Sequence, residues 1–203
     1  MKVARQTIAI LDNAEKIGSV FRVDMRLRPY GDSGPLVLHR AAMEKYYVEQ
    51  GRDWERYAFI KARAIAGDIG AGEDFLTWLS PFIYRRHLDY GAVQSLREMK
   101  GLINKQVELK DLNDDLKLGP GGIREVEFVA QMHQLIWGGQ HSLLRDARLV
   151  PVLGQIGEMG LLPLDQIDAL IRAYVFLRNS EHAVQGEFDR QTHVLPETDD
   201  SRN

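Results

Sequence analysis

One carboxylate and three guanidinium groups share a short segment, residues 21–29, and together they could carry phosphate chemistry. Apolar and charged residues alternate along it, which predicts a half-buried β-strand with one polar face. The polar face holds Asp24 with Arg22, Arg26 and Arg28. The planar fork of arginine fits phosphate oxygens, and a lone aspartate suits Mg²⁺ that also binds phosphate. The alternative is a charged face paired with neighbouring helices.

Composition limits the classes of function. The chain has 203 residues, enough for one large domain or two small ones. Its net charge of −3 makes any anion site local, and we expect no nucleic-acid partner. The absence of cysteine excludes a disulfide scaffold and a thiol nucleophile and suits a cytoplasmic location. The sequence contains no apolar run long enough to predict a membrane span.

The periodicity outside this segment is mostly helical. The strand is predicted to continue through a glycine-rich turn at residues 30–35 into a second short strand at 36–38, forming a hairpin. A glycine-rich break at residues 67–72 divides the chain into predicted domains 1–66 and 67–203. Helices are predicted at residues 4–17, 41–50, from Asp53 onward, and at 73–87, 92–110, 122–137, 146–159 and 164–186.

Two further sets of polar residues admit more than one interpretation. Arg56 and Lys61 either reach nucleotide phosphates or form a solvated basic face over packed aromatic residues. Glu181 and His182 suggest a metal site, but the helix lacks a second histidine at ligand spacing. A hydrogen-bonded network that joins Arg178 to a glutamate of the helix at 122–137 is the favoured alternative.

Three motifs carry a resemblance to a known family. They read VDMRLRPYGDSGPLV at residues 23–37, YYVEQGRDWERYAFIKAR at 46–63 and LGPGGIREVEF at 118–128. In these motifs, and from about residue 18 to the QTHVLP sequence at 191–196, the chain closely resembles the bifunctional glutamine synthetase adenylyltransferase/adenylyl-removing enzymes. The GDSGP and GRDWERY sequences resemble those of the adenylyl-removing half of that family.

The resemblance implies an α+β, mostly helical fold, in which part of a polymerase-beta-like nucleotidyltransferase sheet precedes a helical bundle. Asp24 matches the third metal-binding aspartate of the family, which implies Mg²⁺ as cofactor. The Gly-Ser loop and the Asp-x-Asp pair of the family are missing, so we expect this chain alone to be inactive. Implied site residues are Asp24, Arg26 and Arg28 for catalysis, and Arg22, Arg56 and Lys61 for substrate binding.

The implied activity is removal of AMP from an adenylylated tyrosine of glutamine synthetase by phosphate, which releases ADP. Adenylylation from ATP is an alternative, because the two directions use the same groups. A second alternative is a helical scaffold without catalysis that binds glutamine synthetase or a PII-type signalling protein. All three place the chain in the control of nitrogen metabolism.

Overall fold

The computed structural model describes residues 2–12, 23–86, 114–188 and 192–195, together with scattered positions between 94 and 112. The predicted helix at 92–110, the Gly-Ser pair at 18–19 and Arg22 lie largely or wholly outside these residues. The chain forms two compact units. One combines Met1–Ala58 with Arg63–Phe82, and the other combines Phe59–Ala62 with Ile83–Asn203. The predicted domain boundary at residue 67 stays a prediction.

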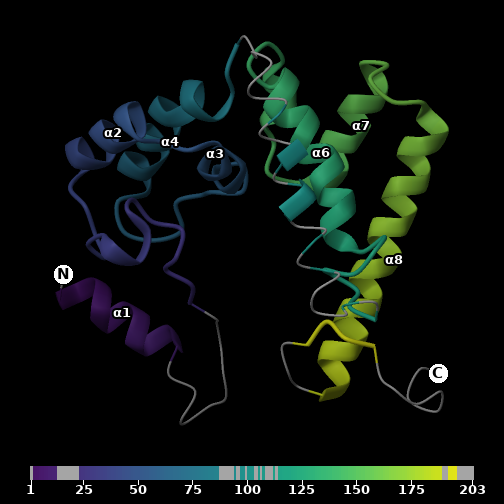
Figure 1. Ribbon diagram of the computed structural model, residues 1–203, viewed down its shortest axis with the longest axis horizontal. Coiled ribbons are helices and arrows are strands. Elements are labelled where there is room, and N and C mark those ends of the chain that lie inside the picture. The colour runs from purple at the N-terminus through teal and green to yellow at the C-terminus, as the bar shows by residue number, and fades with distance from the viewer. Residues whose placement is uncertain are drawn as a thin grey trace. The chain divides into compact units, whose positions relative to one another are not determined.

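The first unit is built from short helices (Figure 1). Aromatic side chains pack between them. The rings of Tyr46 and Tyr47 are buried, and the Tyr47 ring lies 6.4 Å from Phe75 and 5.4 Å from Phe82. Gly51 permits this packing, because a Cβ there would lie 2.5 Å from the Phe82 ring. The helices of this unit are α1 (Lys2–Asp12), η1 (Gly31–Ser33), α2 (Arg40–Glu49), α3 (Asp53–Phe59) and α4 (Ile69–Ile83).

The predicted strand and hairpin are wrong for the described residues. Residues 23–28 form no ladder, residues 36–38 are irregular, and a 3₁₀-helix, η1, occupies the predicted turn. The expected alternation of burial also ends early, because Leu27 is 67% exposed while Arg28 is half-buried. A strand needs a neighbour for its N–H and C=O groups, and these residues meet none in the described part of the chain.

The second unit confirms the predicted mostly helical structure. Helices α6 (Ile123–Trp137), α7 (Leu149–Glu158) and α8 (Leu164–Phe188) pack against one another, with η2 (Ser142–Arg145) between the first two (Figure 1). All three helices begin within about three residues of the predicted starts. Their apolar faces meet in one buried cluster formed by Val126, Ala130, Leu144, Leu149, Val152, Leu153, Ile156 and Ile167.

Helix α4 begins inside the glycine-rich stretch that was predicted to be a break. Asp68 starts the helix, because its carboxylate accepts a hydrogen bond of 3.0 Å from the Ala71 amide. Gly72 then packs closely, since a Cβ at this position would lie 2.6 Å from the Ala64 Cβ. Gly72 therefore serves close packing, whereas Gly67, with φ of 78°, serves chain reversal.

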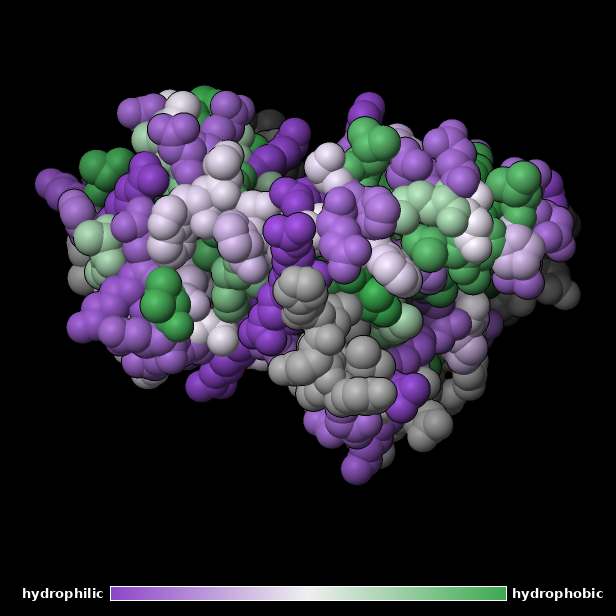
Figure 2. Space-filling model, turned by 90° about the horizontal axis from the view of Figure 1, so that it is seen from above, coloured by the Kyte–Doolittle hydropathy of each residue, from purple (hydrophilic) through white to green (hydrophobic). Residues whose placement is uncertain are grey.

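The surface of the described residues is mixed in polarity. Hydrophobic side chains stand out among hydrophilic ones on the face in Figure 2, and Ile10, Val37, Leu164 and Phe176 are among the large apolar residues that are exposed. None of the described helices combines the length and the apolar character needed to cross a membrane.

Two glycines of the second unit allow a matched test of this packing. A Cβ on Gly122 would lie between 2.8 and 3.0 Å from three backbone carbonyl oxygens, so Gly122→Ala forces a backbone shift. We expect a loss of about 1 to 3 kcal/mol in unfolding free energy in urea. Gly154→Ala, in the middle of α7 with open space around the new methyl group, should instead add about 0.5 to 1 kcal/mol. Equal stabilities of the two variants would contradict this packing.

Candidate functional site

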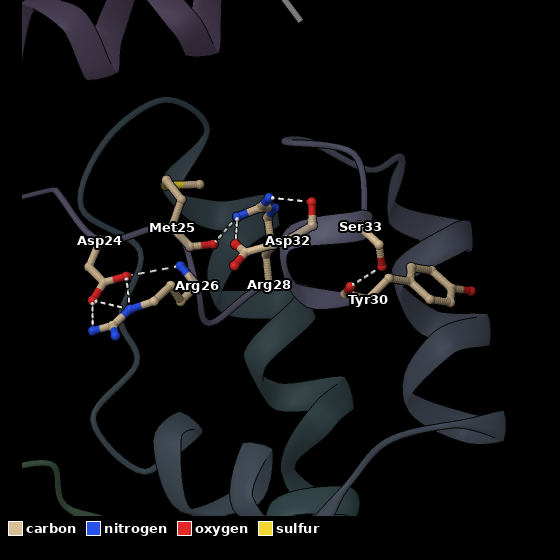
Figure 3. Close-up of polar contacts among 7 residues, drawn as sticks. All are labelled: Asp24, Met25, Arg26, Arg28, Tyr30, Asp32 and Ser33. Carbon is tan, nitrogen blue, oxygen red and sulfur yellow. Dashed lines mark hydrogen bonds and ion pairs between the residues drawn. The ribbon is translucent and has the colours of Figure 1, made fainter.

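Asp24 and Arg26 form a bidentate ion pair at the surface (Figure 3). The Arg26 Nε donates to both carboxylate oxygens at 3.0 Å, and its Nη2 donates to Oδ2 at 2.5 Å. The Arg26 backbone amide adds a fourth contact of 3.0 Å to Oδ1. The pair faces solvent, because the Arg26 side chain is 73% exposed and that of Asp24 is 39% exposed. The hydrogen bond and charge of Asp24 raise the pKa of Arg26, which therefore stays cationic.

Arg28 points inward, unlike Arg26. Its Nη1 donates to the Met25 carbonyl, and its Nη2 donates to the Asp32 carbonyl at 3.3 Å (Figure 3). The Asp32 carboxylate lies 3.5 Å from Nη1. The structure thus brings the three predicted catalytic residues onto one segment, but it gives Arg26 and Arg28 different surroundings. The catalytic role of Arg28 stays a prediction, and Arg22 lies outside the described residues.

The described residues do not by themselves fit a magnesium site. No group of three or more acidic or histidine side chains gathers among them in a metal-binding arrangement. Both carboxylate oxygens of Asp24 already accept hydrogen bonds from Arg26. Magnesium requires about six oxygen ligands, and a single carboxylate supplies at most two of them.

Arg56 lies in the interior of the first unit. Its side chain is 3% exposed, and its Nε donates to the Phe82 carbonyl at 3.0 Å. The Asp53 carboxylate lies 3.4 Å from its Nη1. The neighbouring Glu55 is also buried and accepts a hydrogen bond of 3.1 Å from the Tyr46 hydroxyl. In this structure the Arg56 guanidinium joins α3 to the end of α4.

Lys61 belongs to the second unit, where its Nζ donates to the Ala147 carbonyl at 2.7 Å. The adjacent Asp146 carboxylate accepts a hydrogen bond of 2.8 Å from the backbone amide of Arg148 and pairs with its guanidinium. These bonds, with a smaller contribution from the Lys61 charge, lower the pKa of Asp146 to about 2. Lys61 thus stabilises the turn that leads into α7.

Sequence reasoning missed a charge cluster of the second unit that has a buried carboxylate at its centre. Glu181 is buried, and its carboxylate lies 2.5 Å from Arg178 Nη1, 2.9 Å from His193 Nδ1 and 4.0 Å from Lys117 Nζ. The predicted partner of Arg178 was a glutamate of α6, but Glu125 pairs there with Lys100. The sequence does place Arg178 and Glu181 three residues apart on α8, but their partner His193 lies in a separate segment.

That separate segment, residues 192–195, is fixed by its backbone. Asp115 and Val194 form an isolated antiparallel bridge, the Leu116 amide donates to the His193 carbonyl at 2.8 Å, and the Leu195 amide donates to the Asp114 carbonyl at 2.9 Å. The His193 Nδ1 lies 2.9 Å from the Glu181 carboxylate and 3.4 Å from the Gln185 Nε2, so the segment also contacts α8. The cluster therefore binds together three parts of the second unit.

Comparisons with known proteins define the class first. Residues 1–78 match a family model described as glutamate-ammonia ligase adenylyltransferase. Residues 97–203, more than half of the chain, match a model described as GlnD PII-uridylyltransferase. Both descriptions are of nucleotidyltransferases.

Curated relatives narrow the class to one family. A bifunctional glutamine synthetase adenylyltransferase/adenylyl-removing enzyme of Hahella chejuensis is 53% identical over 99% of this chain. Enzymes of the same name from Nitrosococcus oceani and Pseudomonas aeruginosa are each 52% identical, over 100% and 96% of it. The chain belongs to this family, and it spans about a fifth of the length of these relatives, 21%, 21% and 20% respectively.

The burial of Arg56 generates a stability prediction. Arg56→Ala should lower the unfolding free energy by about 2 to 4 kcal/mol, because the buried guanidinium is lost and the partly buried Phe82 carbonyl loses its charged donor. Arg40→Ala is the matched control, since it removes a surface pair with Glu44 one turn away and should cost less than about 0.5 kcal/mol. Urea unfolding measures both variants. Equal stability of the two, with nucleotide binding lost only in Arg56→Ala, would contradict the structural role and favour substrate binding.

The lowered pKa of Asp146 generates a pH prediction. A carboxyl group whose pKa is lower in the folded than in the unfolded protein stabilises the fold above its unfolded pKa, and this stabilisation is lost as the pH falls toward its folded pKa. For Asp146 that window runs from about 4 to about 2. Asp146→Asn keeps the acceptor for the Arg148 amide, so it should cost about 0.5 to 1 kcal/mol at pH 7. This cost should shrink as the pH falls from about 4 to about 2.

The control for this experiment is Lys61→Ala, which removes the smaller charge contribution to the pKa of Asp146 and also the bond to the Ala147 carbonyl. Its cost should therefore change less with pH than that of Asp146→Asn. Unfolding of the three proteins in urea across this pH range measures the difference. A penalty for Asp146→Asn that does not change with pH would contradict a role for its charge.

Proposed function

We propose that the chain is part of an enzyme that controls glutamine synthetase, and that it belongs to the half that removes adenylyl groups. The exposed pair of Asp24 and Arg26 supports this proposal, since it lies within the residues that match the adenylyltransferase model. Among the predicted catalytic residues, these two present polar groups to solvent. The residues of the motifs around them resemble those of the adenylyl-removing half.

The proposed reaction is phosphorolysis of adenylyl-tyrosine. An oxygen of inorganic phosphate attacks the phosphorus of the AMP group, and the bond from this phosphorus to the tyrosine oxygen breaks. The products are ADP and a tyrosine whose phenolate takes up a proton. The Arg26 guanidinium, once it leaves Asp24, would bind phosphate oxygens and balance the negative charge that accumulates on them.

Magnesium belongs to this proposal as the cofactor of a longer protein that carries the sequence. Asp24 would be one ligand, and the others would come from outside the described residues, because Asp24 does not form such a site alone. Arg22, Arg56 and Lys61 are proposed substrate-binding residues of lower rank, since the structure gives Arg56 and Lys61 backbone partners. A cytoplasmic location completes the proposal.

Two other functions are kept as alternatives. The adenylyltransferase direction, which uses ATP, needs the same charged groups at the same phosphorus. A helical scaffold that binds glutamine synthetase or a PII-type protein is favoured by the match of residues 97–203 to a model named for a PII-uridylyltransferase. The scaffold differs from both enzymatic directions in that it does not need Asp24, because it would use the second unit.

The proposal predicts release of ADP by a full-length protein that carries this sequence, given adenylylated glutamine synthetase, phosphate and Mg²⁺. Asp24→Asn should lower this rate at least about a hundredfold, whereas Asp74→Asn, at an exposed position of α4 in the same unit, should change it little. The chain of 203 residues alone should release none.

The outcomes separate the three functions. Transfer of AMP from ATP, with no ADP released from the adenylylated protein, would select the opposite direction. Full activity of Asp24→Asn would contradict both enzymatic proposals. Binding of a PII-type protein by the chain, unaffected by that substitution, would then support the scaffold.

A further inference from the structure

A sharp corner follows the candidate catalytic pair. Tyr30 has φ of 63° and Gly31 has φ of 54°, so two consecutive residues adopt the left-handed conformation. Glycine accepts this conformation freely, but tyrosine does not, because its Cβ crowds the neighbouring carbonyl oxygen. Tyr30 is the non-glycine residue with positive φ in the described part of the chain. Such strain persists where surrounding contacts hold it in place.

Arg28 supplies contacts on both sides of this corner (Figure 3). Its guanidinium donates to the carbonyl of Met25, which precedes the corner, and at 3.3 Å to the carbonyl of Asp32, which follows it. The Asp32 carboxylate, 3.5 Å from Nη1, adds a charge contact. Backbone bonds from the Gly31 amide to the Arg28 carbonyl at 2.8 Å, and from Gly34 to Gly31 at 3.1 Å, close the same loop.

The burial of Arg28 shows that its side chain is committed to this loop. The side chain is 17% exposed, and its Nε is buried with no hydrogen-bond partner among the described residues. A phosphate could recruit this guanidinium only if it released the carbonyls on both sides of the corner. Arg26 differs, because it is 73% exposed and its side chain contacts one exposed carboxylate.

We propose that Arg28 is a positioning residue, which ties the Tyr30–Gly31 corner and thereby fixes the segment that presents Asp24 and Arg26. It does not contact the substrate phosphate. This inference rests on the proposed function, since it assigns a second kind of role within the same site. In this proposal Arg26 points outward and binds the anion, whereas Arg28 points inward and holds the backbone.

The test compares Arg28→Lys with Arg26→Lys in the full-length protein. Lysine keeps the charge but cannot donate to two carbonyls through a planar fork. Arg28→Lys should lower kcat for ADP release at least about tenfold with KM for phosphate nearly unchanged. It should also speed hydrogen exchange of the Gly31 and Gly34 amides at least about tenfold. Arg26→Lys should instead raise KM for phosphate and leave this exchange unchanged.

Opposite results would overturn the proposal. A rise in KM for phosphate with unchanged exchange in Arg28→Lys would place Arg28 on the substrate. If the unsubstituted protein releases no ADP, the proposed function fails, while the exchange comparison, which needs no substrate, still decides whether Arg28 ties the corner. Arg28→Gln, which keeps one amide donor group, repeats the comparison if the lysine variant fails to fold.

A coupled substitution tests the corner itself. Asparagine adopts the left-handed conformation more readily than tyrosine, so Tyr30→Asn should make the corner less dependent on Arg28. In the background of Arg28→Lys, Tyr30→Asn should restore at least about a third of the lost amide protection, a coupling that neighbouring residues show in double-mutant cycles. Purely additive effects on exchange would contradict the proposal that Arg28 holds this corner.

Discussion

Backbone carbonyl groups at the turns of this chain obtain their donors from cationic side chains, and much of the local structure depends on this. A carbonyl that is removed from water needs a hydrogen-bond partner, and a charged donor makes a stronger bond than a neutral one. Helices satisfy their own carbonyls, but the loops between short helices cannot do so. The pairs are Arg28 with Met25, Arg56 with Phe82, Lys61 with Ala147 and Arg145 with Gly138.

The helices were predictable because their signals are local. Apolar spacing, a glycine before α6 and a proline before α8 suffice to find these elements. The structure of residues 21–29 was not predictable in this way, because alternation shows only that two faces differ in polarity. Whether such a segment becomes a strand depends on a neighbour that supplies hydrogen bonds, and a local pattern carries no information about that neighbour. The start of α4 at Ile69 was missed because Gly70 and Gly72 lie inside the helix, where Gly72 packs against Ala64.

The candidate site was predictable in part. The sequence placed Asp24, Arg26 and Arg28 on one segment, and the structure keeps them there. The sequence could not show which guanidinium faces solvent, because every arginine has the same charge and the same side-chain length. The cluster around Glu181 was beyond reach for another reason, since His193 approaches it only after the segment at 192–195 has paired with residues near Asp115.

Exposure separates the predicted cations more sharply than their residue type does. The Asp24–Arg26 pair lies in solvent, where an ion pair contributes little to stability, so an incoming phosphate can bind Arg26 with a small change in free energy. Arg56 is buried, and removing its bond to the Phe82 carbonyl leaves a partly buried acceptor without its donor. A side chain that must exchange partners during a reaction has to be of the first kind. A side chain that keeps the reacting groups in register has to be of the second.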